Sequence, residues 1–395
     1  MKKESWYITG EGSKFDRFLN IHLDSEGCLC FPSDVLKRNS RLKEKRAVYI
    51  KDRVKTLTNV VLQKLNISMI PPRIPLYFIE VTNTCNLNCD FCPRNDLSRG
   101  TGYMEFDLFK LVIRKIKEMG ARYVNLNRFG ESLMHPQFVQ MLRYAKNQGI
   151  PNIGLVTNGQ LLNREMIEDI VDAGIDRVNV SLDTLDRVKY EKTRKGAKLD
   201  KTVNNLDYLV DYRNRAGKET PIIALFSVLV TDDFGQMQKI FQRFVNRVNY
   251  VEFRPIANYG SSQRLKDLPH IETRKKNILI CIQPWQRLNI FYNGDVNPCC
   301  GDVDGELVIG NIRDFSVKEL WYGEKIKEIR KIITRRAIDS LPICLSCDLN
   351  DWDWYREALH QLREVYHKLD PDINVVDLLA STPLLYRHST KKMWR

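Results

Sequence analysis

Three cysteines in the first quarter of the chain have a spacing that could hold a metal cluster. Cys85, Cys89 and Cys92 follow a short apolar segment in the pattern C-x3-C-x2-C. Three thiolates at this spacing can bind three irons of a [4Fe–4S] cluster and leave the fourth iron open to chemistry. A structural zinc site is the alternative, and it would need a fourth ligand.

A second group of cysteines lies in the last third of the chain. Cys281, Cys299, Cys344 and Cys347 are separated by 18, 45 and 3 residues, and Cys300 directly follows Cys299. Four thiolates are enough for one further [4Fe–4S] cluster. Four cysteines are also a zinc pattern, so this alternative stays open here too.

The composition excludes several classes of protein. The chain has 395 residues and only 10 cysteines, too few for a small disulfide scaffold. It has no apolar run long enough to span a membrane. The first residues, Met1 to Ser5, are not followed by the apolar segment of a signal peptide. We therefore expect a cytoplasmic protein, in whose reducing surroundings cysteines act as metal ligands or catalysts.

Strands and helices alternate along the region that carries the first cysteine group. Short β-branched or aromatic segments bounded by turn residues predict strands at 76–81, 123–126, 153–156, 177–181, 222–229 and 250–253. Apolar residues at helical spacing predict helices at 105–119, 136–148, 162–173, 200–215 and 236–246. This alternation predicts an α/β fold with a parallel sheet. Six strands are too few for a closed eight-stranded barrel, so we expect a partial (β/α)6 TIM barrel with its site at the carboxyl ends of the strands.

Polar motifs follow successive predicted strands. Phe129-Gly130-Glu131 comes after the second strand, Thr157-Asn158-Gly159 after the third, and Ser181-Leu182-Asp183 ends the fourth. Arg194 lies shortly beyond the last of these motifs. Each motif alone is weak, but strand ends of one parallel sheet meet at the same edge, so the set predicts a common binding site.

Together these residues resemble the radical S-adenosylmethionine (radical SAM) superfamily, whose signature is the same C-x3-C-x2-C with an aromatic residue before the last cysteine, here Phe91. The resemblance implies that Cys85, Cys89 and Cys92 bind a [4Fe–4S] cluster whose open iron chelates SAM, and that reductive cleavage of SAM gives a 5′-deoxyadenosyl radical. Where the family usually has Gly-Gly-Glu, this chain has Phe129 before Gly130 and Glu131. By the same resemblance the SAM contacts are Phe91, Gly130, Glu131, Thr157, Asn158, Ser181, Asp183 and Arg194.

The second cysteine group resembles the auxiliary-cluster domain of the SPASM/twitch subgroup. Its intervals are similar to those of a twitch-type sugar-alcohol dehydrogenase, which implies one auxiliary [4Fe–4S] cluster on Cys281, Cys299, Cys344 and Cys347. We expect Cys300 to face a different direction and to border the substrate, where its thiol could donate a hydrogen atom as in radical SAM epimerases. A buried spacer or an alternative ligand is the competing interpretation of Cys300.

These features divide the chain into four predicted parts. Residues 1–70 form an N-terminal extension, 71–262 the radical SAM core, 263–350 the SPASM/twitch domain with the auxiliary [4Fe–4S] cluster, and 351–395 a C-terminal helical tail. Arg254, at the end of the sixth strand, and Arg264 are candidate substrate-binding residues, as is Arg128. Arginine stays protonated, so binding of a hydroxyl or an anion is the role it suits.

The resemblance implies a radical SAM oxidoreductase or epimerase, and the net charge of +13 favours an anionic partner. The substrate of such an enzyme would be carbohydrate-like or aminocyclitol-like, including the anionic forms that a basic protein attracts. Its electron donor would be a flavodoxin or ferredoxin. A peptide- or protein-modifying maturase of the same superfamily is the alternative. A zinc-stabilised nucleic-acid-binding protein is a distant third, and we do not expect nucleic acid as a partner.

Overall fold

The central sheet contains all six predicted strands. The computed structural model describes residues 22–23, 29–32, 70, 74–229, 234–244, 246–255, 281 and 283–347. Within these ranges the strands lie side by side in chain order and run parallel. They are β3 (Leu76–Ile79), β5 (Tyr123–Asn125), β6 (Asn152–Thr157), β7 (Arg177–Ser181), β9 (Ile222–Leu229) and β10 (Tyr250–Pro255).

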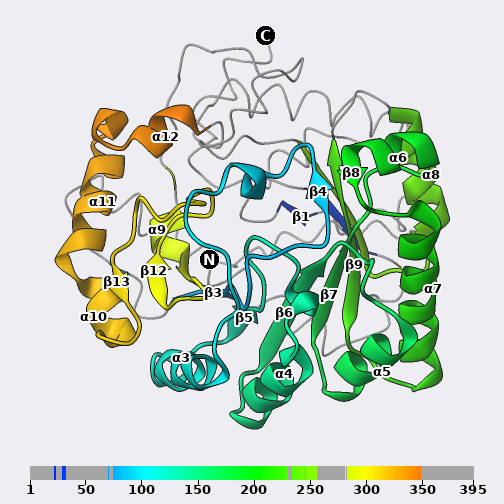
Figure 1. Cartoon of the computed structure of the whole chain (residues 1–395), viewed down its shortest axis with the longest axis horizontal. Coiled ribbons are helices and arrows are strands. Elements are labelled where there is room, and N and C mark those ends of the chain that lie inside the picture. The colour runs from blue at the N-terminus through cyan, green and yellow to red at the C-terminus, as the bar shows by residue number, and fades with distance from the viewer. Residues whose placement is uncertain are drawn as a thin grey trace, which may run out of the picture.

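Helices connect these strands and cover the outer side of the sheet (Figure 1). Each of the five predicted helices forms, with ends within two residues of the predicted ones. They are α3 (Phe106–Glu118), α4 (Phe138–Asn147), α5 (Arg164–Asp172), α7 (Leu199–Arg215) and α8 (Phe234–Phe244). In α3 the buried positions recur every three or four residues and face the sheet. The partial barrel predicted from the sequence is confirmed.

Among the α-helices between β3 and β10, one short helix was not predicted. It is α6 (Arg187–Thr193), in which Tyr190 is the buried residue. Asp186 caps it by accepting a hydrogen bond from the backbone N–H of Lys189 at 3.0 Å. Its surface is too polar to give an apolar period, so tertiary contacts rather than sequence pattern fix it in place.

The sheet continues beyond the six strands at both edges. Next to β10 lies β2 (Leu29–Pro32), antiparallel, and then β1 (His22–Leu23). Next to β3 lies β11 (Arg287–Ile290), which is parallel to it, followed by the antiparallel strands β12 (Asp295–Asn297) and β13 (Gly310–Asn311). The segment with the second cysteine group is therefore built onto the core sheet, next to the strand that leads to the first group.

Short elements complete the described part of the chain. Asn88–Cys89 (β4) pairs with Arg194–Lys195 (β8) in a separate two-stranded sheet. The turn at Asn293-Gly294, where Gly294 has φ +95°, joins β11 to β12 as the sequence predicted. The other helices are η2 (Pro93–Asp96), η3 (Ser132–Met134), α9 (Gln283–Gln286), α10 (Val317–Tyr322), α11 (Glu324–Thr334), η5 (Ile338–Ser340) and α12 (Pro342–Ser346).

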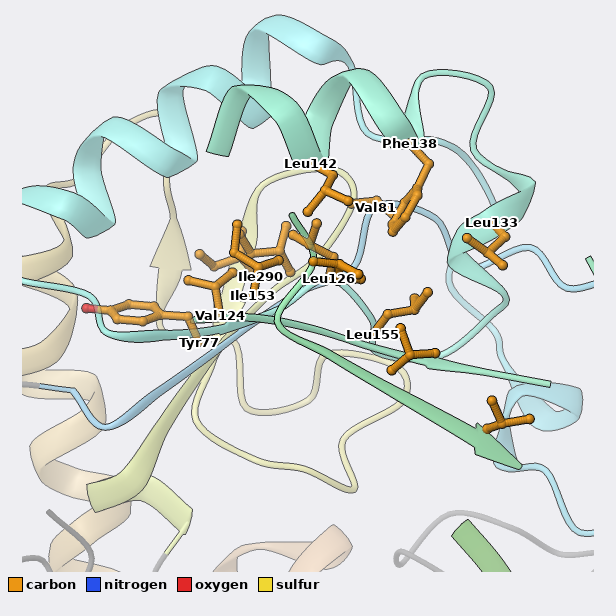
Figure 2. Packing of buried hydrophobic residues seen from close by; sticks show 14 of the residues in the cluster. Tyr77, Val81, Val124, Leu126, Leu133, Phe138, Leu142, Ile153, Leu155 and Ile290 are labelled. Carbon is orange, nitrogen blue, oxygen red and sulfur yellow. The ribbon is translucent and has the colours of Figure 1, made fainter. Parts of the chain in front are cut away.

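A hydrophobic core fills the space between the sheet and the helices. Figure 2 shows Val124 and Ile153 from neighbouring strands beside Leu142 of α4 and Ile290 of β11. All four are buried, so β11 shares one core with the barrel. In the described part of the chain, no helix combines the length and the apolar character needed to cross a membrane. The predicted tail 351–395, and most of the predicted extension 1–70, lie outside the described residues.

Candidate functional site

The first three cysteines share one loop between β3 and α3. Cys89 is buried in β4, while Cys85 and Cys92 are half-buried. The Cys92 N–H donates to the Cys89 carbonyl at 3.2 Å, and the Asn95 side chain donates to the same carbonyl at 2.7 Å. Burial raises the pKa of all three thiols, to about 12 for Cys89. Iron binding must therefore displace their protons, as metal binding to thiols does.

Neighbouring side chains order the rest of this loop. Arg94 donates to the Leu87 carbonyl at 3.0 Å, and the Leu87 N–H points at the Cys85 sulfur at 3.4 Å. The Asn158 amide donates to Asn86 at 2.8 Å and lies 3.9 Å from the Cys85 sulfur. N–H groups aimed at cluster sulfurs tune the reduction potential of an iron–sulfur centre. The loop thus has the donor set and the surroundings that a three-cysteine cluster requires.

Glu131 connects the ends of three strands. Its carboxylate accepts hydrogen bonds from the Asn158 N–H at 2.8 Å and the Leu133 N–H at 3.3 Å. Its own N–H donates to the Thr84 carbonyl at 2.7 Å. The side chain is 1% exposed, and burial raises its pKa to about 7 against the opposing effect of these hydrogen bonds. The sequence prediction that this motif meets the cysteine loop at one edge of the sheet agrees with these contacts.

The backbone conformation and surroundings of Gly130 require a glycine at this position. It has φ +91°, and a Cβ placed there would lie 2.6 Å from the Thr84 carbonyl oxygen. A side chain would therefore collide with the backbone directly before Cys85.

Asp183 and Arg194 form a buried ion pair. Two hydrogen bonds of 2.5 and 2.9 Å join the guanidinium to the carboxylate, and the Val228 N–H donates to the same carboxylate at 2.8 Å. The guanidinium carbon lies 5.1 Å from the centre of the Phe91 ring. Burial alone would lower the pKa of Arg194, but the charge of Asp183 outweighs it and the pKa is raised. Three predicted SAM contacts therefore come together, although Asp183 and Arg194 are bound here to each other.

The remaining predicted SAM contacts lie at neighbouring strand ends. Ser181 is half-buried at the end of β7, and the Thr157 hydroxyl at the end of β6 accepts a hydrogen bond from the Gly159 N–H at 3.1 Å. Their contact with SAM stays a prediction.

All five C-terminal cysteines line one pocket. Cys281, Cys299, Cys300, Cys344 and Cys347 share it with Gln283, Pro284, Leu307, Ile333 and Ile343. The Cys300 thiol is buried and hydrogen-bonds to the Cys299 thiol. The expectation that Cys300 faces away from the other cysteines is thus wrong, because two adjacent residues in a loop need not alternate as they do in a strand. Its role as a hydrogen donor stays a prediction.

The positions of the thiols do not by themselves distinguish zinc from an iron–sulfur cluster. Among the residues that the structure describes, no three His, Cys, Asp or Glu side chains are gathered closely enough to hold a metal ion. The family matches reported below distinguish the two.

Buried polar residues that the sequence reasoning missed hold the loop after β12. The Asp302 side chain, which is 0% exposed, accepts hydrogen bonds from the backbone N–H groups of Gly305, Glu306 and Leu307 at 2.8–2.9 Å. The Asn289 amide donates to the Cys299 carbonyl at 2.8 Å. The sequence offered one signal for these supports, which is Asn289 within the buried strand β11. A buried polar side chain needs a hydrogen-bond partner, so its presence indicates a polar contact nearby.

The three predicted substrate arginines have different outcomes. Arg128 does not lie free in a substrate site, because its guanidinium donates to carbonyl oxygens of Cys299, Cys300 and Asp302. The side chain of Arg254, in β10, and the whole of Arg264 lie outside the described residues, so their roles stay predictions.

Two family matches cover the two cysteine groups. Residues 79–233 match the radical SAM superfamily, and residues 281–348 match the SPASM iron–sulfur cluster-binding domain. The chain belongs to the radical SAM superfamily. The two domains imply that it binds SAM and [4Fe–4S] clusters, and the residues present fit these groups because each domain places its cysteines around one loop or pocket. A radical SAM enzyme also needs a reductant and a substrate.

Relatives by sequence have different activities. A tungsten-containing aldehyde ferredoxin oxidoreductase cofactor-modifying protein of Pyrococcus furiosus is 24% identical, over 69% of this chain and 87% of that protein. A GTP 3′,8-cyclase of Chlorobaculum tepidum is 35% identical over 33% of this chain, a match that spans only 40% of the cyclase.

The solved structures of anSMEcpe and SuiB share the fold. The anSMEcpe structure with bound AdoMet has a TM-score of 0.53 at 15% identity, covering 74% of this chain and 98% of that one. Streptococcus suis SuiB bound to S-adenosylmethionine has a TM-score of 0.52 at 16% identity, covering 69% and 70%. BtrN in complex with AdoMet and 2-DOIA has a TM-score of 0.47 at 17% identity, covering 70% and 93%.

Proposed function

We propose that this radical SAM enzyme uses one auxiliary cluster to oxidise or epimerise a carbohydrate-like or aminocyclitol-like substrate. The observation that carries the proposal is the single pocket lined by all five cysteines that follow the radical SAM domain. Five thiols are too few for two four-cysteine clusters, so one auxiliary cluster is expected. A cluster at this position can accept the electron that remains when a carbinol carbon is oxidised.

The residues around the first cysteine loop have different roles in binding SAM. Cys85, Cys89 and Cys92 would hold the cluster, which when reduced supplies the electron that cleaves SAM to a 5′-deoxyadenosyl radical. The Glu131 carboxylate stands beside the cysteine loop, where it can accept hydrogen bonds from an ammonium or amine. Glu131, Thr157 and Asn158 at these strand ends are buried, and a buried site limits the access of water to a reactive species.

The charge of the chain supports an anionic form of the substrate. A net charge of +13 attracts anions over long distances, as in a sugar phosphate or a nucleotide-linked sugar. Flavodoxin or ferredoxin, which are acidic electron carriers, would suit the same surface as reductants. We place the reaction in the cytoplasm, where such carriers and reduced thiols are found.

Iron analysis and isotope transfer test this proposal. Anaerobically purified protein should contain iron and sulfide for two [4Fe–4S] clusters, and the triple change of Cys85, Cys89 and Cys92 to Ala should halve that content. Candidate substrates deuterated at a carbinol carbon should pass deuterium to 5′-deoxyadenosine. Zinc in place of iron, or deuterium transfer from peptides but from no sugar or aminocyclitol, would contradict the proposal.

Cys300 offers a test of the epimerisation branch. If its thiol returns a hydrogen atom to the substrate radical, Cys300→Ser should abolish epimerisation and leave SAM cleavage intact. Solvent deuterium should enter the product only in the unchanged enzyme. The matched control is Cys344→Ser, which should reduce the iron content. Epimerisation at the original rate by Cys300→Ser would rule out the donor role.

A peptide-modifying activity is the second candidate. SuiB and anSMEcpe, whose folds resemble this chain with TM-scores of 0.51 and 0.52, have been solved with a bound precursor peptide and a Cp18Cys peptide. The deuterium experiment decides between the two candidates when labelled peptides and labelled sugars are compared under the same conditions.

A further inference from the structure

Arg128 physically joins the two cysteine sites. It lies after β5, directly before the Phe129-Gly130-Glu131 motif that contacts the first cysteine loop. Its Nη2 donates to the carbonyl oxygens of Cys299 at 2.7 Å and Asp302 at 3.0 Å, and its Nη1 donates to that of Cys300. One side chain therefore fixes the loop that carries the auxiliary thiols against the loop that borders the SAM motif.

The guanidinium of Arg128 is hydrogen-bonded to carbonyl oxygens, and Glu80 and Asp302 are the carboxylates whose charges act on it from beyond ion-pair distance. Within the described ranges, no carboxylate forms an ion pair with it, and its Nε is buried without a hydrogen-bond partner. The guanidinium carbon lies 4.5 Å from the Phe129 ring centre and 6.0 Å from that of Phe291. A charge in such surroundings is costly unless an opposite charge lies nearby.

The neighbouring arginine shows the contrast. Arg99 forms two hydrogen bonds of 2.8 and 2.6 Å with the buried carboxylate of Glu80, and it also donates to the Val303 carbonyl at 2.5 Å. Arg99 thus holds the same loop with its charge neutralised. Arg128, by contrast, directs its hydrogen bonds to the Cys299 and Cys300 backbone and not to a carboxylate.

We propose that Arg128 is a positioning residue of the auxiliary cluster and that its cation raises the cluster's reduction potential. This inference rests on the auxiliary cluster of the proposed function. A cluster bound by thiolates is an anion, and the one electron it accepts adds negative charge without making or breaking a bond. A fixed cation nearby stabilises the reduced form more than the oxidised form. Arg128 would thereby make the cluster a better electron acceptor for substrate oxidation.

The potential can be measured on the auxiliary cluster alone. The full chain with Cys85, Cys89 and Cys92 changed to Ala serves as the parent, and a redox titration followed by electron paramagnetic resonance gives the midpoint potential. Arg128→Gln should lower this potential while iron and sulfide per chain stay unchanged. Arg128→Lys keeps the charge and should restore a potential close to that of the parent.

Arg213→Gln is the matched control. Arg213 is also a buried arginine bound to uncharged acceptors, the Pro221 carbonyl at 3.1 Å and the Asn249 side chain at 2.7 Å, but it lies on α7, which packs against α5 and α6. Its substitution should destabilise the protein and leave the potential of the auxiliary cluster unchanged.

Four outcomes would overturn the inference. If the cluster has the same potential in Arg128→Gln and Arg213→Gln, this inference is refuted. The proposed auxiliary cluster is not, because it would still be present. An equally lowered potential in Arg128→Lys and Arg128→Gln would show that geometry rather than charge matters. A parent without iron would refute the auxiliary cluster and this inference together. If Arg128→Gln cannot be loaded with iron, the potential of Arg128→Lys decides, and a lowered value counts against the inference.

Discussion

The buried pair of Asp183 and Arg194 shows how one residue can serve both stability and the site. Their side chains are 4% and 7% exposed, so each charge depends on the other. Removing one partner of a buried pair leaves an uncompensated charge in a medium of low dielectric constant. The same pair places Arg194 beside Phe91 and next to the cysteine strand β4.

Asp183→Asn should therefore lower the free energy of unfolding strongly, by about 3–5 kcal/mol. The control is Asp90→Asn, which breaks the ion pair between Asp90 and Lys195. The side chain of Asp90 is 45% exposed and that of Lys195 is 58% exposed. An exposed pair contributes only about 0–1 kcal/mol. Urea denaturation of both iron-free variants measures the difference, and similar losses in the two would contradict the argument.

Glu131 predicts a pH dependence of stability. Burial raises its pKa from 4.5 to about 7 in the folded protein, so the folded state binds the proton more tightly than the unfolded state does. This group's contribution to stability is fully present below pH 4.5 and is lost as the pH rises to about 7. The loss corresponds to roughly 3 kcal/mol at most.

The measurement compares iron-free wild-type protein with Glu131→Gln across that pH range. The variant lacks the titrating carboxyl. The unfolding free energy of the wild type minus that of the variant should therefore fall as the pH rises from 4.5 to about 7. Parallel pH profiles would show that the pKa of Glu131 is not raised.

At the scale of elements, the close approach of two loops sets the requirement at Gly130. Gly130→Ala should be strongly destabilising and should weaken SAM binding, because the new Cβ would lie 2.6 Å from the Thr84 carbonyl and push on the cysteine loop. Gly149→Ala is the control, since Gly149 has φ +83° but nothing within 4 Å of an added Cβ. It should cost only the strain of the left-handed conformation, about 1–2 kcal/mol. Thermal unfolding and SAM titration of the cluster-loaded proteins measure both effects, and equal results for the two would contradict a steric clash.

The strands and helices of the barrel could be predicted because their signals are local. The period of α3 and the β-branched residues of β9 are visible within a dozen residues. The pairing of β11 with β3 could not be predicted in this way, because it joins segments about 200 residues apart with no common pattern. Arg128 was misinterpreted for a related reason. Its type suggests an anion ligand, and only the fold shows that backbone carbonyls of a distant loop take its donors.

The site was predictable to the extent that chemistry constrains residue type. Cysteine spacing and strand-end motifs identified both cluster regions, and the family matches over residues 79–233 and 281–348 agree with them. The direction of Cys300 depended on the path of one loop, which Asp302 and Asn289 fix through buried hydrogen bonds. Such supports carry no signature of their own in the sequence.

At the scale of the whole molecule, the shared sheet makes the two cysteine domains one folding unit. β11 covers the edge of β3, and Ile290 enters the same core as Val124 and Ile153 (Figure 2). A chain ending at residue 255, after β10, would leave β3 as an open edge and expose apolar core residues. Unpaired edges of this kind promote aggregation. We expect that chain to aggregate, and a chain ending at residue 347, which keeps every described element, to remain monodisperse in size-exclusion chromatography. A shorter chain that is monodisperse and unfolds cooperatively would show that the radical SAM barrel is complete without the strand that the auxiliary domain supplies.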